Sequence, residues 1–212
     1  MAQLGLRERK KQQTRELIAE TARRLFAQRG FDHVTVAEIA RLADVSETTV
    51  FNYFPTKEDL VYWRMAAFDE QLLDAIRNRP AGASILAAFE RFVLAPRGLL
   101  GTTDPEAIER LAELTRMITE SPALLERERE IVDGYTTSLA AVLAAEARAP
   151  LSDLSPWVVA NALMGVHRAL INFTRAQIVA GVRNPLLARS VRTQGRRALD
   201  TLRRGLDGYG AR

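Results

Sequence analysis

The sequence predicts an all-α protein, and two observations support this fold class. Apolar residues recur at spacings of three and four, whereas strand-type alternation of valine, threonine and tyrosine runs for no length. The eight prolines mark joints, because proline fits only the first turn of a helix or a loop between helices. Nine helices are expected at about 14–29, 35–42, 46–53, 57–77, 84–94, 105–119, 122–146, 156–180 and 185–206.

The composition is that of a globular protein. Its 212 residues are 47% hydrophobic and 26% charged, which suffices for a core without covalent cross-links. Cysteine is absent, which excludes thiolate zinc sites, thiol nucleophiles and redox switching. Polar residues interrupt the apolar segment "WVVANALMGVHRALINF", and the basic start has no apolar run after it. We therefore expect a cytoplasmic protein without a membrane span.

The net charge of +4 is less informative than its placement. One basic zone lies near the N-terminus and a second decorates the last expected helix, and both are candidates for contact with nucleic acid. The first zone contains Arg7, Arg9, Lys10, Lys11 and Arg15, and the second contains Arg189, Arg192, Arg196, Arg197, Arg203 and Arg204.

The stretch "VAEIARLADVSETTVFNYFPTKEDL" brings two short helices and a tight turn close together. Thr35 and Ser46 stand where N-caps belong, since their side-chain oxygens accept hydrogen bonds from unpaired backbone N–H groups at a helix start. Ile39 and the small Ala40 fall on the buried side of the first helix, and Asp44 takes the turn. This spacing is typical of a helix-turn-helix, whose second helix presents its first residues to the major groove of DNA.

The same stretch, preceded by "TRELIAETARRLFAQRGFDHV", resembles the DNA-binding domain of the TetR family of bacterial transcriptional repressors. The resemblance covers roughly the first 60 residues and implies a three-helix DNA-binding domain followed by a helical bundle for ligand binding and dimerisation. The residues that match the family pattern are Thr35, Ile39, Ala40, Val45, Ser46, Thr49, Phe51, Tyr53, Phe54 and Lys57.

Two positions depart from the family pattern. Asp44 replaces the usual glycine of the turn, and aspartate tolerates a left-handed backbone better than most residues, so we expect a left-handed conformation there. The run "FNYF" replaces the commoner tyrosine-X-histidine-phenylalanine at the end of the second helix. This second departure concerns the DNA target rather than the fold.

The resemblance also implies roles at the DNA. Thr48, Thr49 and Asn52 would touch bases, because asparagine can bind adenine bidentately and a threonine methyl can pack on thymine. Phe51 and Tyr53 would contact sugar-phosphate or a thymine methyl, and Thr35 and Lys57 would contact phosphates. Phe51 also fits a core position, as Phe54 does. The expected DNA-binding residues are Thr35, Ser46, Thr48, Thr49, Phe51, Asn52, Tyr53 and Lys57, with Arg7, Arg9, Lys10 and Lys11 of a basic N-terminal arm.

The expected domains are a DNA-binding domain at residues 1–56 and an effector-binding and dimerisation domain at residues 57–212. A single helix-turn-helix reads only a half-site, so we expect a homodimer. The resemblance places its interface on the last two helices. Small residues on the first of these helices permit close approach, an apolar stripe follows the second, and the arginines around that stripe are interpreted as a solvated rim. The small residues are Ala160, Gly165 and Ala169, and the stripe is Val191, Ala198, Leu199, Leu202 and Leu206.

Aromatic residues and methionines recur at helical spacing between the two ends of the chain, a pattern that is also typical of plain core. The resemblance gives some of them the lining of a cavity for a small apolar effector. On one expected helix, Asn161, Arg168 and Asn172 share a stripe and His167 points elsewhere, so these polar residues cannot all serve one pocket. The expected ligand-binding residues are Trp63, Phe68, Phe89, Phe92, Met117, Tyr135, Asn161, Met164 and His167.

The leading hypothesis is a repressor that leaves a pseudo-palindromic operator when the effector binds. The alternative is a DNA-binding regulator or activator that has no small ligand and answers to a protein partner, which a filled core would favour. An enzyme is not expected: His33 and His167 are the only histidines, and no phosphate loop, metal-ligand spacing or catalytic triad occurs. No metal or cofactor is expected.

Overall fold

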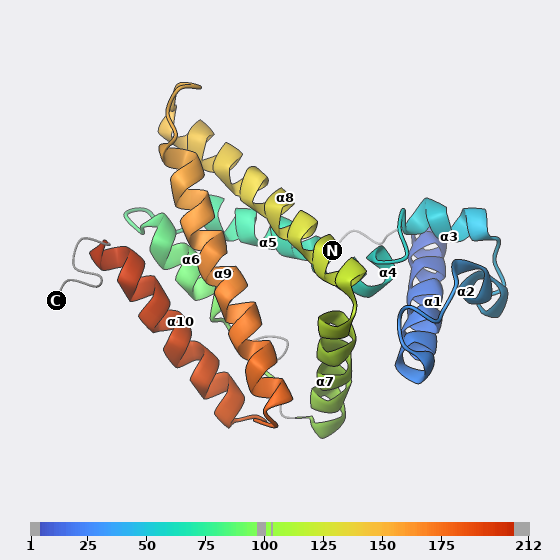
Figure 1. Cartoon of the computed structure of the whole chain (residues 1–212). Coiled ribbons are helices and arrows are strands. Elements are labelled where there is room, and N and C mark those ends of the chain that lie inside the picture. Colours follow the sequence, from blue (N-terminus) through green and yellow to red (C-terminus); the bar gives the residue numbers. More distant parts are fainter. Residues whose placement is uncertain (1–4, 97–100, 103, 206–212) are drawn as a thin grey trace. The chain divides into compact units, whose positions relative to one another are not determined.

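The computed structural model describes residues 5–96, 101–102 and 104–205, and within them the protein is all-α, as expected (Figure 1). Strands are absent from this part of the chain. Its helices are α1 (Leu6–Arg29), α2 (Val36–Leu42), α3 (Glu47–Tyr53), α4 (Asp59–Tyr62), the 3₁₀ helix η1 (Trp63–Met65), α5 (Ala66–Arg77), α6 (Ile85–Val93), α7 (Pro105–Glu120), α8 (Pro122–Ala147), α9 (Ser155–Val179) and α10 (Leu186–Arg204).

The chain divides into two compact units. The first comprises the described residues of Met1–Ala66 together with Met117–Arg127, and the second those of Ala67–Arg116 and Glu128–Arg212. The first unit therefore extends beyond residue 56, where we expect the functional division, and that division stays a prediction.

Helix α1 begins at Leu6, earlier than the expected start at residue 14. The segment "LRERKKQQ" lacks an apolar stripe, so the periodicity rule does not detect a helix there. Its arginines, lysines, glutamate and glutamines are nevertheless good helix formers. The expected arm at Arg7–Lys11 is thus helical and forms the first turns of α1.

The helix-turn-helix is capped where the sequence predicts. Thr35 accepts a hydrogen bond from the Glu38 N–H, and the Glu38 carboxylate accepts one from the Thr35 N–H, so a reciprocal capping box starts α2. Ser46 caps α3 by accepting from the Thr49 N–H. Asp44 has a φ of 53°, which confirms the expected left-handed turn. Ile39 is buried beneath the turn.

The helix expected at residues 57–77 is broken. In the turn that leads into α4, the side chains of Thr56 and Asp59 each accept a hydrogen bond from the N–H of the other residue. The 3₁₀ turn η1 separates α4 from α5. No proline or glycine lies at this break. Residues 117–127, which belong to the first unit, make contacts with α4. The Tyr62 hydroxyl donates to the Leu124 carbonyl at 2.9 Å, and Arg127 pairs with Asp59 at 2.9 Å.

The second unit has its own core, built from α5, α6, α8, α9 and α10. Phe89, Leu139 and Leu199 are completely buried in it, and Met164 is 1% exposed. Helix α10 packs on α9 and α6. Over the described residues, no helix combines the length and apolar character needed to cross a bilayer.

Candidate functional site

The outer face of α3 carries the residues expected to read DNA bases. Thr48 and Asn52 are exposed one helical turn apart, and the ring of Phe51 is 46% exposed between them. Val50 and Phe54 point the other way and are 1% exposed, so Phe54 is a core residue, as expected. A polar and aromatic surface of one short helix is thereby presented to solvent.

Thr49 is less available than Thr48. It is half-buried, and its hydroxyl lies 2.8 Å from the Ser46 hydroxyl at the start of α3. Both hydroxyls therefore belong to the cap of the helix. A base contact from Thr49 depends on its methyl group or on reorganisation of this hydrogen bond.

Thr35 is committed to the capping box of α2. Its hydroxyl donates to the Glu38 carboxylate at 3.1 Å. The hydrogen bond from Arg29, together with that from the Thr35 N–H, lowers the pKa of Glu38 to about 2. The Glu38 charge is paired with Arg29 at 2.7 Å, and the expected phosphate contact of Thr35 competes with the hydrogen bonds of the capping box.

Lys57 has a structural role that the sequence did not reveal. Its Nζ donates to the carbonyls of Phe31 and Val34 at 3.1 and 3.2 Å and lies 4.0 Å from the centroid of the Phe31 ring. Two of the three ammonium donors are thus used to hold the loop between α1 and α2. One donor is left for the expected phosphate contact.

A cleft of about 450 Å³ lies between the basic start of α1 and the end of α3. Arg7, Lys10 and Lys11 line it on one face of α1, and Tyr53 lines it from α3. The other lining residues are Glu8 and Thr14. Arg9 is exposed on another face of α1 and is not part of the cleft. The helical start of α1 therefore adds positive charge beside α3.

An aromatic cluster lies within the second unit, centred on Phe68 of α5. The Phe68 ring stacks on His167 at 4.6 Å and on Tyr135 at 5.1 Å, measured between ring centroids, and meets Phe92 edge-on at 5.2 Å. Four of the expected ligand-binding residues are thus brought together. Phe89 and Met164 are buried in the same core.

Two polar atoms in this region lack hydrogen-bond partners. They are Nε2 of His167 and Oδ1 of Asp69, both buried. Burial lowers the pKa of His167 to about 4, so the imidazole is neutral at pH 7. Burial raises the pKa of Asp69, against an opposing side-chain hydrogen bond with Ser138, and burial with the nearby Asp69 charge raises that of Tyr135 to about 12.

Asp69 is a residue that the sequence interpretation missed, because a single aspartate on an amphipathic helix is usually solvated. The only available signal was its place directly after Phe68. Of the other expected ligand-binding residues, Trp63 and Met117 belong to the first compact unit. Asn161 of the second unit is exposed and donates to the Trp157 carbonyl, so it is not part of the cluster.

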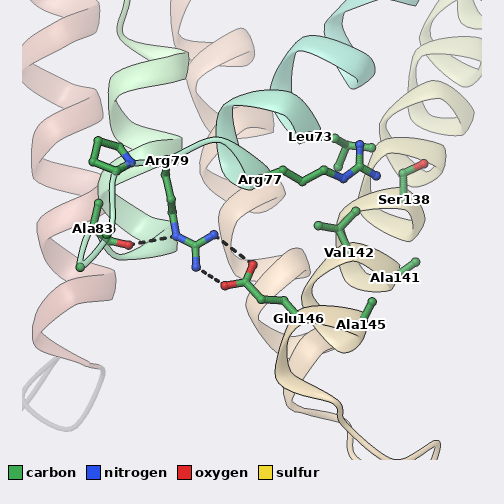
Figure 2. A pocket seen from close by; sticks show the side chains of 12 residues that line it. Leu73, Arg77, Arg79, Ala83, Ser138, Ala141, Val142, Ala145 and Glu146 are labelled. Atoms are coloured by element: carbon green, nitrogen blue, oxygen red, sulfur yellow. Dashed lines mark hydrogen bonds and ion pairs between the residues drawn. The ribbon is translucent and has the colours of Figure 1, made fainter.

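A separate cleft of about 830 Å³ opens in the second unit (Figure 2). It contains none of the expected ligand-binding residues. Arg79 spans it by donating to the Ala83 carbonyl and pairing with both carboxylate oxygens of Glu146. The cleft is lined by Leu73, Arg77, Arg79, Pro80, Ala81, Gly82, Ala83, Ser138, Ala141, Val142, Ala145 and Glu146.

The expected dimer surface divides between buried and exposed residues. On α10, Val191 and Leu199 are buried within the same protomer, because this stripe packs on α9 and α6. Ala160 of α9 is also buried. Leu206 lies outside the described residues. The outer face of α9 instead shows a stripe of mostly small and apolar side chains, interrupted by the exposed Asn172: Val158, Ala162, Gly165, Ala169, Ala176 and Val179.

Comparison with known proteins finds relatives of the first unit and of most of the chain. Residues 18–62 match the family model described as "Bacterial regulatory proteins, tetR family". The HTH-type transcriptional regulator TcmR of Streptomyces glaucescens is 32% identical over 151 residues, which cover 70% of this chain and 67% of TcmR.

Two solved structures have a similar fold. One is NalD, the secondary repressor of the MexAB-OprM multidrug efflux pump in Pseudomonas aeruginosa, with a TM-score of 0.54, 21% identity and coverage of 93% of this chain and 97% of NalD. The other is the transcriptional regulator FadR from Bacillus subtilis in complex with stearoyl-CoA, with a TM-score of 0.51, 22% identity and coverage of 88% and 96%. At these identities the likeness concerns the fold.

Proposed function

Because the chain belongs to the TetR family of DNA-binding transcriptional regulators, we propose that it is a homodimeric repressor, released from a pseudo-palindromic operator by a small, largely apolar effector. The observation that carries the DNA-binding part is the outer face of α3. Thr48, Phe51 and Asn52 are exposed there on a helix whose start is fixed by a cap and whose inner side is packed. Such a helix can enter the major groove without unfolding.

The basic start of α1 supplies the second part of the interface. Arg7, Lys10 and Lys11 lie on one helical face beside Tyr53 of α3. Positive side chains held in this way position a protein on the phosphate backbone, whereas the α3 face discriminates between bases. The proposed division of labour is therefore phosphate contact from α1 and base contact from α3.

The proposed dimer joins two such half-site readers through α9, with α10 at the rim. The outer stripe of α9 has small residues, Gly165 and Ala169, that permit helices to approach closely. The exposed positions of α10 are largely polar, including Arg189, Arg196 and Arg197. An apolar seam on α9 flanked by arginines has the form of an interface core with a solvated rim.

The proposed effector site is the aromatic cluster. Buried polar groups in proteins nearly always have partners, so the unpaired atoms of Asp69 and His167 indicate a missing donor or acceptor there. The Met1–Ala66 segment of the first unit ends two residues before Phe68. A ligand that moves Phe68 thus acts on the segment leading into η1 and α4, and a coupling of about 1–3 kcal/mol suffices for regulation.

A second candidate function is a regulator controlled by a protein partner. The rings of Phe68, Phe92, Tyr135 and His167 contact one another, so the cluster is filled in this conformation. Under this alternative the second unit serves dimerisation and partner binding, and small molecules leave operator affinity unchanged.

The DNA-binding proposal is tested by selecting an operator from random duplexes and comparing affinities for operator and random DNA. Asn52→Ala is expected to reduce the preference for operator by about tenfold, which corresponds to one lost base contact. Lys10→Ala is expected to weaken both duplexes equally and to lower the slope of log affinity against log salt by about one.

Arg24→Ala is the matched control, because Arg24 is exposed farther along α1 and the substitution removes the same charge. Its salt slope should remain that of the wild type. An Asn52→Ala protein with unchanged preference for operator would contradict base reading by α3. Deleting the gene should raise transcription from the operator if the protein is a repressor, and a fall would identify an activator.

A further inference from the structure

Asp69 of α5 is a half-buried acidic residue of the second unit. Its Oδ1 is buried without a hydrogen-bond partner. A carboxylate oxygen only accepts hydrogen bonds, and leaving it unpaired away from water is costly. Oδ1 therefore lacks a hydrogen-bond donor, although the Asp69 carboxyl also has a side-chain hydrogen bond with Ser138.

The side chains that act on Asp69 carry charges of both signs. The groups that act on Asp69 are Ser138, Glu70 and Arg77, with Tyr135 nearby. Only Arg77 is positive, and the ion pair it makes in the described part of the chain is with Asp74, at 3.9 Å. His167 is neutral because of its burial.

Aromatic rings lie near Asp69. Phe68 is adjacent to Asp69 in the sequence and stacks on both Tyr135 and His167. Aromatic faces attract cations through the negative charge density of the ring, and a nearby carboxylate adds a charge-assisted hydrogen bond. This combination favours a positively charged ligand over a neutral or negative one.

Ser138 connects Asp69 to the cleft of about 830 Å³, because it bonds to the Asp69 carboxyl and also lines the cleft. Figure 2 shows Ser138, Ala141, Val142 and Ala145 following one another along α8 on the cleft wall, opposite Leu73 and Arg77 of α5. Apart from Ser138 and from Glu146, which pairs with Arg79, the α8 side of this wall is apolar. The cleft volume is within the range of small-molecule sites.

We propose that the second unit binds a lipophilic organic cation, with its protonated nitrogen at Asp69 beside Phe68 and Tyr135 and its planar apolar body along the α8 wall of the cleft. This inference rests on the proposed function, since it names the chemical class of the effector. The two arginines that line the cleft, Arg77 and Arg79, differ in how strongly they would repel a bound cation. Arg79 is compensated by Glu146, whereas Arg77 is exposed and is the group that an anionic ligand would use.

The test compares three fluorescent probes with one aromatic body and different head groups: pyrenylmethylamine, pyrenylmethanol and pyrenecarboxylate. Binding to the full-length protein without DNA is measured by fluorescence anisotropy. The wild type is expected to bind the amine at least about tenfold more tightly than the alcohol, and the carboxylate most weakly. Asp69→Asn keeps the shape of the side chain and should abolish the preference for the amine.

Asp74→Asn is the matched control, because Asp74 is an exposed carboxylate on the same helix, and its preference should equal that of the wild type. Tightest binding of the carboxylate, lost in Arg77→Gln, would overturn the proposal in favour of an anion site. Equal binding of all three probes would also overturn it. The head-group comparison in the wild type needs no variant, so it decides even if Asp69→Asn fails to fold.

Operator affinity is measured separately in the presence of the amine. Amine binding that depends on Asp69 but leaves operator affinity unchanged would support the site and contradict the effector-released repressor. Conversely, the protein could be released from operator by another class of compound and show no preference for the amine probe. That result would support the effector-released repressor and overturn the cation site.

Discussion

Asp44 forms the turn between α2 and α3 in a left-handed conformation, with a φ of 53°. Residues with a Cβ are strained there, aspartate less than most, and glycine is not. Asp44→Gly is therefore expected to raise the free energy of unfolding by about 0.5–1 kcal/mol. Thermal or denaturant unfolding of the two proteins measures the change.

Asp44→Ala provides the comparison for this turn. Alanine has a Cβ but lacks the short polar side chain that makes aspartate tolerable in this conformation, so it should be the least stable of the three. In order of decreasing free energy of unfolding, we expect Asp44→Gly, then the wild type, then Asp44→Ala. A glycine variant less stable than the wild type would show that the aspartate side chain stabilises the turn by more than the strain it carries.

His167 predicts a dependence of stability on pH. Its pKa is lowered to about 4 by burial, compared with about 6.5 in an unfolded chain. Above pH 6.5 neither state binds the proton, but between pH 6.5 and 4 the unfolded state binds it and the folded state does not. Stability should therefore fall by about 2 kcal/mol between pH 7.5 and 5 because of this residue.

His167→Phe keeps an aromatic ring against Phe68 and removes the titration, so its stability should fall less over this pH range. His33 is the other histidine of the sequence and is exposed, and His33→Gln is the control. Unfolding free energies at several pH values provide the measurement. Parallel curves for wild type and His167→Phe would contradict a neutral, buried imidazole.

At the residue scale, local chemistry was predictable and long-range partners were not. Thr35, Ser46 and Asp44 could be placed because a cap or a left-handed turn depends on a few neighbouring residues. Lys57 was assigned only to phosphate, since its bonds to the carbonyls of Phe31 and Val34 cross more than twenty residues of sequence. No periodicity indicates such a pair.

At the element scale, Gly134 of α8 offers a simple test of helix stability. It lies within the helix, is exposed, and an added Cβ would meet nothing within 4 Å. Glycine in a helix costs conformational entropy relative to alanine, so Gly134→Ala should raise the free energy of unfolding by about 0.5–1 kcal/mol. Denaturant unfolding measures this gain.

Gly195 of α10 is the opposite case. A Cβ there would lie 2.5 Å from Cδ2 of Leu94 and 3.4 Å from Cδ1 of Leu170. Gly195→Ala should thus be less stable than Gly134→Ala by about 1–3 kcal/mol, since the same gain in helix propensity is offset by overpacking. Equal gains at both positions would mean that Leu94 moves aside without cost.

The boundaries of helices were predictable where punctuation was explicit. The prolines at the start of α7 and α8 fall where the sequence places them. The break at Trp63–Met65 carries no such signal, and the start of α1 lacks an apolar stripe. A helical segment that buries no apolar face forms because its residues have high intrinsic helix propensity. The spacing of apolar residues gives no sign of such a segment.

At the scale of the whole molecule, the sequence pattern predicted an all-α chain but not which segments assemble. Residues 117–127 join the first unit through Tyr62 and Asp59, which lie about sixty residues away in sequence. The apolar stripe of α10 was assigned to a partner protomer because amphipathicity shows that a face is buried, not what buries it. In the structure α10 packs on α9 and α6 of its own chain.

The last prediction concerns the dimer that operator binding requires. Gly165 lies in the middle of the exposed α9 stripe, and an added Cβ there meets nothing within 4 Å of the same chain. Gly165→Glu should therefore leave the protomer folded but place charges in the proposed seam, raising the dimer dissociation constant by at least about hundredfold. Operator affinity should fall with it, because each protomer then binds a half-site alone. Gly134→Glu, at the other open helical glycine, is the control and should remain dimeric in sedimentation equilibrium. A dimeric Gly165→Glu protein with full operator affinity would place the interface elsewhere than on α9.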